Sequence, residues 1–252
     1  MSLFNTYDPH SQEIIKVRDQ RSFQPVDHFP ETIIMTFKEN TFQLLNSLYP
    51  AEPITFLRGG RTIPVYSVHW NGQSIGMIHS LLGGAGTACL LEQAIAYGAK
   101  KVLLYGGCGV LNRALAAGHL IIPTEAYRDE GTSYHYLPVS DYVDIPTHTR
   151  LESIFEELKL PFVSGRVWTT DAFYRETRGN MEKRKADGCI AVDMECASAM
   201  AAAQFRGIEA YQFFFAEDSL DNEHWDPRTL GAMPASDHEM YLKIALETAT
   251  RL

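Results

Sequence analysis

Residues 74–109 read SIGMIHSLLGGAGTACLLEQAIAYGAKKVLLYGGCG, and this stretch indicates the fold class. Residues 74–80 and 101–106 are short apolar runs bounded by glycine or asparagine, which is typical of strands. Between them, residues 87–97 repeat their apolar positions with the period of a helix. A strand, a helix and a second strand in this order predict a βαβ unit within one sheet.

The same alternation extends along the chain. Further strands are predicted at residues 32–37, 63–69, 119–123, 162–168, 189–192 and 208–216. Further helices are predicted at residues 39–48, 148–158, 195–206 and 236–250. Asn71-Gly72 between two extended runs is typical of a type I′ hairpin, so at least one strand pair is antiparallel. We therefore expect one α/β domain with a mixed, twisted central β-sheet flanked by helices.

The beginning of the chain differs from the rest. Residues 1–30 carry scattered charges without a clear period, which predicts an N-terminal arm over the domain or a neighbouring subunit. A frayed terminus is the alternative. Residues 31–252 show no repeat or linker and are expected to form the domain.

Charge and cysteine content exclude several classes of partner. The 252 residues include 31 acidic and 22 basic side chains, so a nucleic acid or an anionic membrane surface is not an expected partner. The four cysteines lie in apolar or small-residue segments without the spacing of metal ligands. This spacing gives no reason to expect a metal site. Residues 1–10 lack the order of a secretory signal, so we expect a cytoplasmic protein.

Three predicted strands end in glycine or polar residues, where ligands gather in α/β sheets. Residues 82–87, LGGAGT, open a helix, and their N–H groups suit an anion or a sugar; tight packing of the turn is the alternative. The glycines of residues 105–109 imply a close approach of a ligand or a helix. Residues 169–177 place an aromatic pair in a polar loop, and such a pair is also common in a core.

Two acidic sites follow. Glu195 stands between a strand and an Ala-rich helix, where the helix dipole favours an ionised carboxylate that accepts from hydroxyls; a plain helix cap is the alternative. Glu217 and Asp218 end a very hydrophobic strand. Desolvation there would raise a carboxyl pKa and create a proton donor, whereas a solvated strand end would not.

Taken in order, these segments resemble the nucleoside phosphorylase family, which includes purine nucleoside phosphorylase, uridine phosphorylase and methylthioadenosine nucleosidase. The resemblance covers roughly residues 31–250. It is carried by residues 82–87, 103–109, 118–123 with 128–133, 171–177, 192–195 and 217–218. It implies a nucleoside phosphorylase-like fold, a homo-oligomer (a dimer or a trimer of dimers), and cleavage of an N-glycosidic bond in nucleoside salvage.

The resemblance also implies roles for residues around the nucleoside. Met194 and Glu195 would hold the ribose, with the carboxylate accepting from its hydroxyls. Phe173 would pack against the base, and Tyr174 would line the pocket. Asp218 matches the aspartate that acts at N7 of a purine, and it is the expected catalytic acid.

Uridine phosphorylases instead carry a Gln-x-Arg pair a few residues after the aromatic. Thr177 and Gly179 stand at those positions here, so the resemblance favours a purine nucleoside over uridine.

The phosphate site departs from the family pattern. The usual arginine of the first-strand loop is absent from residues 36–40, and Leu104 stands at the position of a second arginine. Lys38 is a candidate replacement for one lost charge. The backbone of Gly84 and Gly107 is expected to contact the phosphate. A neighbouring subunit is expected to contribute Arg61, with Arg58 as the alternative. His10, on the arm of a neighbour, is expected at the ribose.

These residues favour phosphorolysis slightly, with phosphate as co-substrate, no cofactor, and free base and ribose 1-phosphate as products. A nucleosidase that uses water, with Glu39 or Glu217 as base, is the alternative because two arginines are missing. A nucleoside-binding or storage protein is a third reading. A metal-dependent hydrolase is a fourth, built on Glu217, Asp218, Asp221, Glu223, His224 and Asp226.

Overall fold

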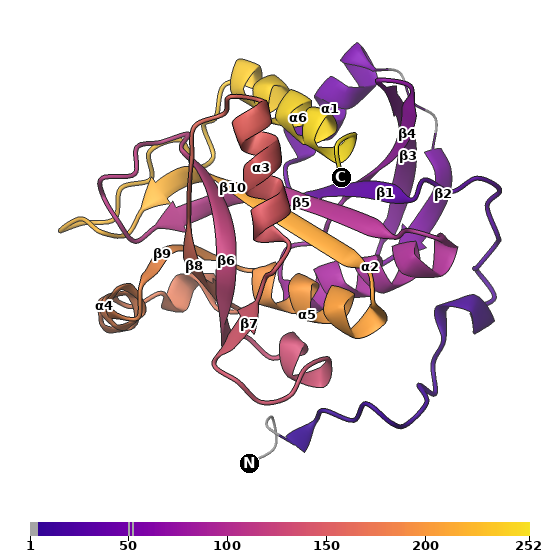
Figure 1. Cartoon of the computed structure of the whole chain (residues 1–252), viewed down its shortest axis with the longest axis horizontal. Coiled ribbons are helices and arrows are strands. Elements are labelled where there is room, and N and C mark those ends of the chain that lie inside the picture. The colour runs from indigo at the N-terminus through magenta and orange to yellow at the C-terminus, as the bar shows by residue number, and fades with distance from the viewer. Residues whose placement is uncertain (1–4, 50, 52) are drawn as a thin grey trace.

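A computed structural model describes residues 5–49, 51 and 53–252 of the chain. In these residues ten strands form one mixed sheet in the order β10-β6-β8-β9-β5-β1-β4-β3-β2, with β7 paired to β6 (Figure 1). The strands are β1 (Thr32–Thr36), β2 (Pro53–Arg58), β3 (Thr62–Trp70), β4 (Gln73–His79), β5 (Lys101–Val110), β6 (Leu120–Asp129), β7 (Tyr142–Asp144), β8 (Phe162–Thr170), β9 (Cys189–Asp193) and β10 (Glu209–Ser219). The expected mixed α/β fold is therefore confirmed.

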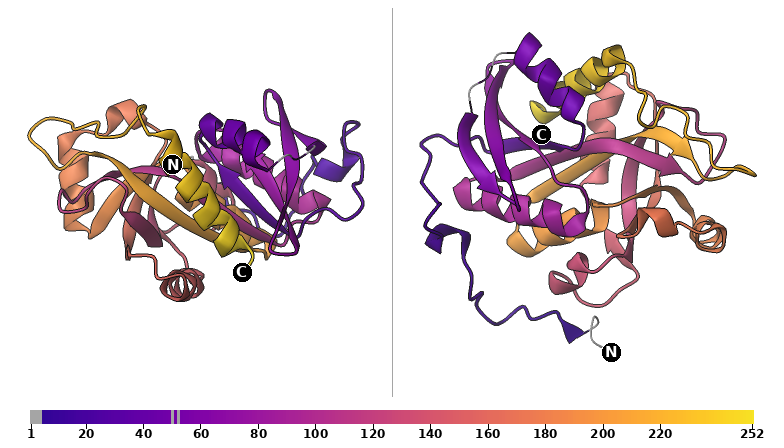
Figure 2. Two further views of the ribbon diagram at one scale, coloured as in Figure 1. Left: turned by 90° about the horizontal axis from the view of Figure 1, so that it is seen from above. Right: turned by 180° about the vertical axis from the view of Figure 1, so that it is seen from behind.

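Helices cover both faces of this sheet. They are α1 (Glu39–Leu48), α2 (Gly84–Tyr97), α3 (His148–Glu157), α4 (Arg178–Ala186), α5 (Cys196–Arg206) and α6 (Ala235–Ala249). Figures 1 and 2 show α1, α3 and α6 on one face and α2 and α5 on the other. Successive residues of β1 alternate between the two cores, with Ile33 and Met35 facing α2 and α5 and Ile34 facing α1, α3 and α6.

The βαβ unit and the hairpin follow the sequence prediction. β4 and β5 both pair in parallel with β1, so α2 crosses over β1 to join them. β3 and β4 pair antiparallel, with Trp70 opposite Gln73. Asn71 and Gly72 between them have φ angles of 47° and 79°, which a type I′ turn requires.

Three elements were not predicted because their sequences carry little periodic signal. β2 begins with Pro53 and lies at the edge of the sheet, where proline is tolerated. α4 buries Met181 and is otherwise polar, so it has no apolar stripe. β7 has only three residues.

β5 is the strand on which the other parts of the sheet meet, because it pairs with β1, β9 and β10. The parallel pairing of β5 with β10 is regular from Lys101 opposite Glu209 to Cys108 opposite Ala216. It then shifts, so that Asp218 is opposite Gly109 and Glu217 is an extra residue. Such a bulge turns side chains that would otherwise alternate between faces.

Residues 5–31 run along the outside of the domain before β1 (Figures 1 and 2). Thr6 Oγ1 donates to the carbonyl of Tyr134, Arg18 Nε donates to the carbonyl of Ala96, and Glu13 pairs with Arg206. This segment thus contacts its own domain, and contact with a neighbouring subunit stays a prediction. The expectation about a secretory signal concerns residues 1–10, of which 1–4 lie outside the described residues.

None of the helices in the described ranges is long and apolar enough to cross a bilayer.

Gly84 provides a test of the close packing between α2 and α5. A Cβ atom at Gly84 would lie 2.1 Å from Ser198 Oγ, and Ser198 is fully buried. We expect Gly84→Ala to lower the free energy of unfolding by about 2 kcal/mol through this overlap. Gly179→Ala in α4 is the matched control, since a Cβ there meets nothing within 4 Å, and it should be neutral or stabilising by up to about 1 kcal/mol. Urea denaturation measures both, and equal effects would contradict the packing role.

Candidate active site

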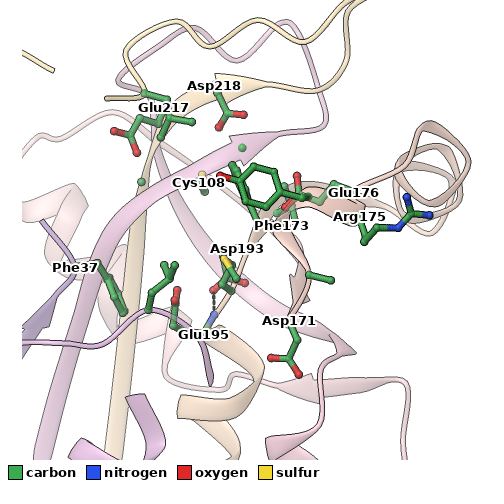
Figure 3. Close-up of a pocket in the computed structure, with 18 of the residues that line it drawn as sticks. Phe37, Cys108, Asp171, Phe173, Arg175, Glu176, Asp193, Glu195, Glu217 and Asp218 are labelled. Atoms are coloured by element: carbon green, nitrogen blue, oxygen red, sulfur yellow. Dashed lines mark hydrogen bonds between the residues drawn. The ribbon is translucent and has the colours of Figure 1, made fainter. Parts of the chain in front are cut away.

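A cavity of about 590 Å³ opens where β5, β9 and β10 end and where the loop after β8 crosses them (Figure 3). This volume suits a nucleoside-sized ligand. Its walls include six residues that the sequence placed in the site, namely Gly107, Phe173, Tyr174, Met194, Glu195 and Asp218. The carboxyl ends of the strands therefore bring these residues together, although they come from four separate parts of the chain.

Asp218 lies at one end of this cavity, beside the bulge of β10. Its side chain is buried, and Oδ2 accepts a hydrogen bond from Trp225 Nε1 at 2.7 Å. Burial raises the pKa of Asp218 above its usual value, although the bond from Trp225 opposes this shift. The carboxyl therefore has the desolvated surroundings that the sequence predicted for a proton donor.

Asp193 and Glu195 lie together at the other end of the cavity in Figure 3. Asp193 is the residue that caps α5, because its Oδ2 accepts from the backbone N–H groups of Glu195 and Cys196 at 2.8 and 2.6 Å. Thr169 donates a further bond to Asp193 Oδ1. Glu195 instead accepts from the N–H of Gly83, at 2.7 Å.

These contacts differ from the expectation that the helix dipole stabilises the ionised form of Glu195. Burial, and then the adjacent Asp193 carboxylate, raise the pKa of Glu195 well above its usual value. Asp193 takes the N–H groups of the helix terminus, so Glu195 receives little of their stabilisation. A ligand that donates hydroxyl hydrogens would supply what the side chain lacks.

Glu217 and Lys38 form an ion pair on the cavity wall. Lys38 Nζ donates to Glu217 Oε1 at 2.5 Å, and the Glu217 side chain is only 4% exposed. A Cβ atom on Gly107 would lie 1.8 Å from Glu217 Oε2, so the carboxylate sits directly against this glycine. The space that the resemblance assigns to phosphate is thus bordered by a carboxylate. Leu104 is fully buried in the core.

The other predicted contacts lie elsewhere on the chain. Gly84 is buried against Ser198, while Leu82 from the same loop lines the cavity. Arg58, Arg61 and His10 are exposed outside this cavity. Gly84 therefore fits the packing alternative, and the roles of the other three residues, which require a second chain, stay predictions.

The structure adds residues to the wall that sequence reasoning did not assign. They are chiefly Phe37, Cys108, Arg175 and Glu176, all labelled in Figure 3. Glu176 lies in the polar loop that the sequence singled out, and a carboxyl two residues after Tyr174 was the available signal. Thr177 caps α4 by accepting from the N–H of Asn180, which explains its presence in this loop.

The acidic residues after β10 have separate partners. Asp221 pairs with Lys185 and accepts from the N–H of Arg113, while Asp226 pairs with Arg228. Within the described ranges, no group of three or more His, Cys, Asp or Glu residues is arranged to hold a metal ion. The structure therefore gives no support to the metal-dependent hydrolase.

Comparison with models of known protein families assigns the chain to one of them. The family model described as the phosphorylase superfamily matches residues 32–249. The chain belongs to the phosphorylase superfamily. The resemblance drawn from the sequence is therefore confirmed at the level of the family, and with it the expectation of an enzyme of the nucleoside phosphorylase and nucleosidase type.

Other members of the phosphorylase superfamily are similar over most of the chain. Purine nucleoside phosphorylase of Plasmodium vivax is 26% identical over 190 residues, covering 73% of this chain and 76% of that protein. Purine nucleoside phosphorylase DeoD-type 1 of Shewanella oneidensis is 24% identical over 229 residues, covering 89% and 95% respectively.

Two solved structures share the fold of this superfamily member. One is purine nucleoside phosphorylase of Toxoplasma gondii, with a TM-score of 0.73, 23% identity, and coverage of 93% of this chain and 94% of that one. The other is AMP nucleosidase of Bacteroides thetaiotaomicron, with a TM-score of 0.70, 21% identity, and coverage of 89% and 90%.

The raised pKa of Glu195 has a consequence for stability. Between about pH 4.5 and its folded pKa, the folded protein keeps the proton that the unfolded chain releases, so stability falls as pH rises. Glu195→Gln removes this penalty, and at pH 8 it should raise the free energy of unfolding by about 1–2 kcal/mol. Urea denaturation at pH 5 and pH 8 measures the change, with exposed Glu157→Gln as control. A gain that does not grow with pH would contradict the assignment.

Proposed function

We propose that this protein hydrolyses the N-glycosidic bond of purine nucleosides, releasing the free base and ribose. The observation that carries this proposal is the Lys38–Glu217 ion pair, which lies against Gly107 where the family resemblance expects phosphate. The names of the similar proteins support nucleoside cleavage: three are purine nucleoside phosphorylases and one is an AMP nucleosidase.

The nucleoside is held by residues at the two ends of the cavity. Glu195, with Met194 beside it, accepts from the ribose hydroxyls, and binding of the diol favours its ionised form. Phe173 packs against the base, and Tyr174 borders it at the mouth, where its side chain is 93% exposed. In this proposal the bond to be broken lies between Glu195 and Asp218.

Asp218 assists departure of the base. Its buried carboxyl donates a proton to N7 of the purine as the bond between N9 and C1′ lengthens. The base then leaves as a neutral molecule, and positive charge develops on the ribose ring. The ionised Glu195 and Glu217 carboxylates stabilise this charge because they line the same cavity.

The charge of the cavity favours water as nucleophile. Six carboxyl groups line it, against two cationic side chains, Lys38 and Arg175; the carboxyl groups belong to Asp171, Glu176, Asp193, Glu195, Glu217 and Asp218. Lys38 is already neutralised by Glu217. Arg175 is then the one unpaired cationic side chain on the described wall that a phosphate dianion could meet, whereas water needs no cation.

Glu217 is the base in this proposal. Burial raises the pKa of Glu217 despite its pairing with Lys38, which brings its proton affinity closer to that needed near neutral pH. Water attacks C1′, its proton goes to Glu217, and the proton of Asp218 leaves with the base. The sum is nucleoside plus water giving base plus ribose.

Phosphorolysis is the second candidate, and the observation in its favour is that similar proteins are named phosphorylases. It requires a homo-oligomer in which Arg58 or Arg61 of a neighbouring chain completes the phosphate site. The same assembly would bring His10 to the ribose. Free ribose and ribose 1-phosphate distinguish the two candidates.

The nucleophile is tested by incubating a panel of nucleosides with and without phosphate. We expect base release at the same rate in both cases, with free ribose as the sugar product. Glu217→Gln should slow this release by about a hundredfold, because the amide cannot accept the proton. Glu223→Gln, an exposed position in the following loop, should have no effect. Ribose 1-phosphate formed only with phosphate would establish phosphorolysis instead.

The acid is tested with leaving groups of different basicity. Asp218→Asn keeps the shape of the side chain and removes its proton, so turnover of a purine nucleoside should fall by about two to four powers of ten. A 4-nitrophenyl riboside needs no protonation to leave, and its turnover should fall by less than about tenfold. Equal losses on both substrates would show that Asp218 is not the acid.

A further inference from the structure

A buried carboxylate lies behind the wall of the cavity rather than in it. Glu130 directly follows β6, and its side chain is buried. Ser198 Oγ in the first turn of α5 donates to Glu130 Oε2, and Ser133 Oγ in the short helix η3 (Thr132–His135) donates to Oε1. The backbone N–H of Ser133 also donates to Oε2, at 3.0 Å. Glu130 therefore joins the end of β6, η3 and the beginning of α5.

The negative charge of Glu130 is balanced by a buried cation. Arg128 Nε donates to Ser133 Oγ at 2.8 Å, so this hydroxyl accepts from the arginine and donates to Glu130. The Arg128 guanidinium lies 3.9 Å from the centre of the Tyr134 ring, which helps to hold it in place. In such a network each member fixes the next, and loss of one member leaves buried polar groups unpaired. The network therefore holds Ser198 Oγ in one position.

Ser198 lies between α5 and the turn that begins α2. A Cβ atom at Gly84 would lie 2.1 Å from Ser198 Oγ, so this hydroxyl is in close contact with the turn. The preceding residue of the turn, Gly83, donates its N–H to Glu195 Oε1 at 2.7 Å. Glu195 stands three residues before Ser198, at the start of the same helix. The donor and the acceptor of this hydrogen bond thus belong to the two segments that meet at Ser198.

We propose that Glu130 is a positioning residue for ribose binding. Through Ser198 it fixes the turn at Gly83 relative to α5, and this orients the Glu195 carboxylate toward the hydroxyls of the sugar. The inference rests on the proposed function, in which Glu195 accepts from those hydroxyls. Gly83 has a φ angle of 89°, which favours glycine, so the direction of its N–H depends on this turn. A displacement of about 1 Å is enough to weaken binding of a transition state strongly.

The test compares adenosine and inosine with their 2′-deoxy counterparts, which lack one hydroxyl that Glu195 accepts from. The ratio of kcat/KM for the ribonucleoside to that for the deoxynucleoside, measured on one preparation, cancels any loss of folded protein. We expect Glu195→Gln to lower this ratio about ten- to a hundredfold, the effect of losing a hydrogen bond to a charged group. Glu130→Gln should lower it about three- to tenfold, because the amide presents a donor where the carboxylate accepts. Glu157→Gln, at an exposed position, should leave it unchanged.

Two further variants separate positioning from a purely structural role. Ser198→Ala keeps Glu130 and removes one donor to it, so the ratio should fall about threefold. The double variant Glu130→Gln/Glu195→Gln should lower the ratio no further than Glu195→Gln alone, since both changes act on the same contact. A structural role would reduce cleavage of ribonucleoside and deoxynucleoside equally and leave the ratio constant.

The outcomes distinguish this inference from the proposed function. A ratio that falls in Glu195→Gln but stays constant in Glu130→Gln and Ser198→Ala would overturn the inference and leave the proposed function intact. A further fall in the double variant would also overturn it, because Glu130 would then act independently of Glu195. A constant ratio in Glu195→Gln would overturn both the ribose contact and the inference built on it. Cleavage of neither ribonucleoside by the wild type would overturn the proposed function itself.

Discussion

The candidate active site depends on one constraint, which is the parallel pairing of β5 with β10 and the bulge that interrupts this pairing at Glu217. In a regular strand Glu217 and Asp218 would point to opposite faces, and one of them would enter a core. The bulge opposite Cys108 and Gly109 lets both carboxyls line the cavity. Gly107 is part of the same arrangement, because the Glu217 carboxylate occupies the space of a side chain there. The two strands thus set the positions of the proposed base and the proposed acid together.

Around this pair the protein keeps further carboxyl groups away from water. The cost appears as raised pKa values at Asp193, Glu195, Glu217 and Asp218, each with burial as its largest cause. Two apolar cores, one on each face of the sheet, provide the stability that offsets it. The small residues of α5 contribute directly, since Ala197 to Ala203 are buried and let α2 approach closely.

The sequence predicted the parts of this structure that have a local signal. Strand and helix alternation, the turn at Asn71-Gly72, and the glycine or acidic ends of strands led to Phe173, Met194, Glu195 and Asp218. The bulge could not be predicted, because it arises from the register of two strands that are far apart in the chain. The same holds for the pair of Lys38 with Glu217, separated by 179 residues. For Asp193 and Glu195, the sequence showed two acids separated by Met194, and backbone geometry decided which one accepts from the N–H groups that begin the helix.

The pairing of β5 with three other strands also has a consequence for the synthesis of the chain. β1 and β4 can assemble with β5 once about 110 residues have been made, but its partner β10 ends at Ser219. Until then one edge of this very apolar strand has no partner in the nascent protein, and such edges favour aggregation. A chain released early would also lack both Glu217 and Asp218. A chain that ends before β10 therefore retains Phe173 and Glu195 but has neither of the two carboxyls proposed as base and acid.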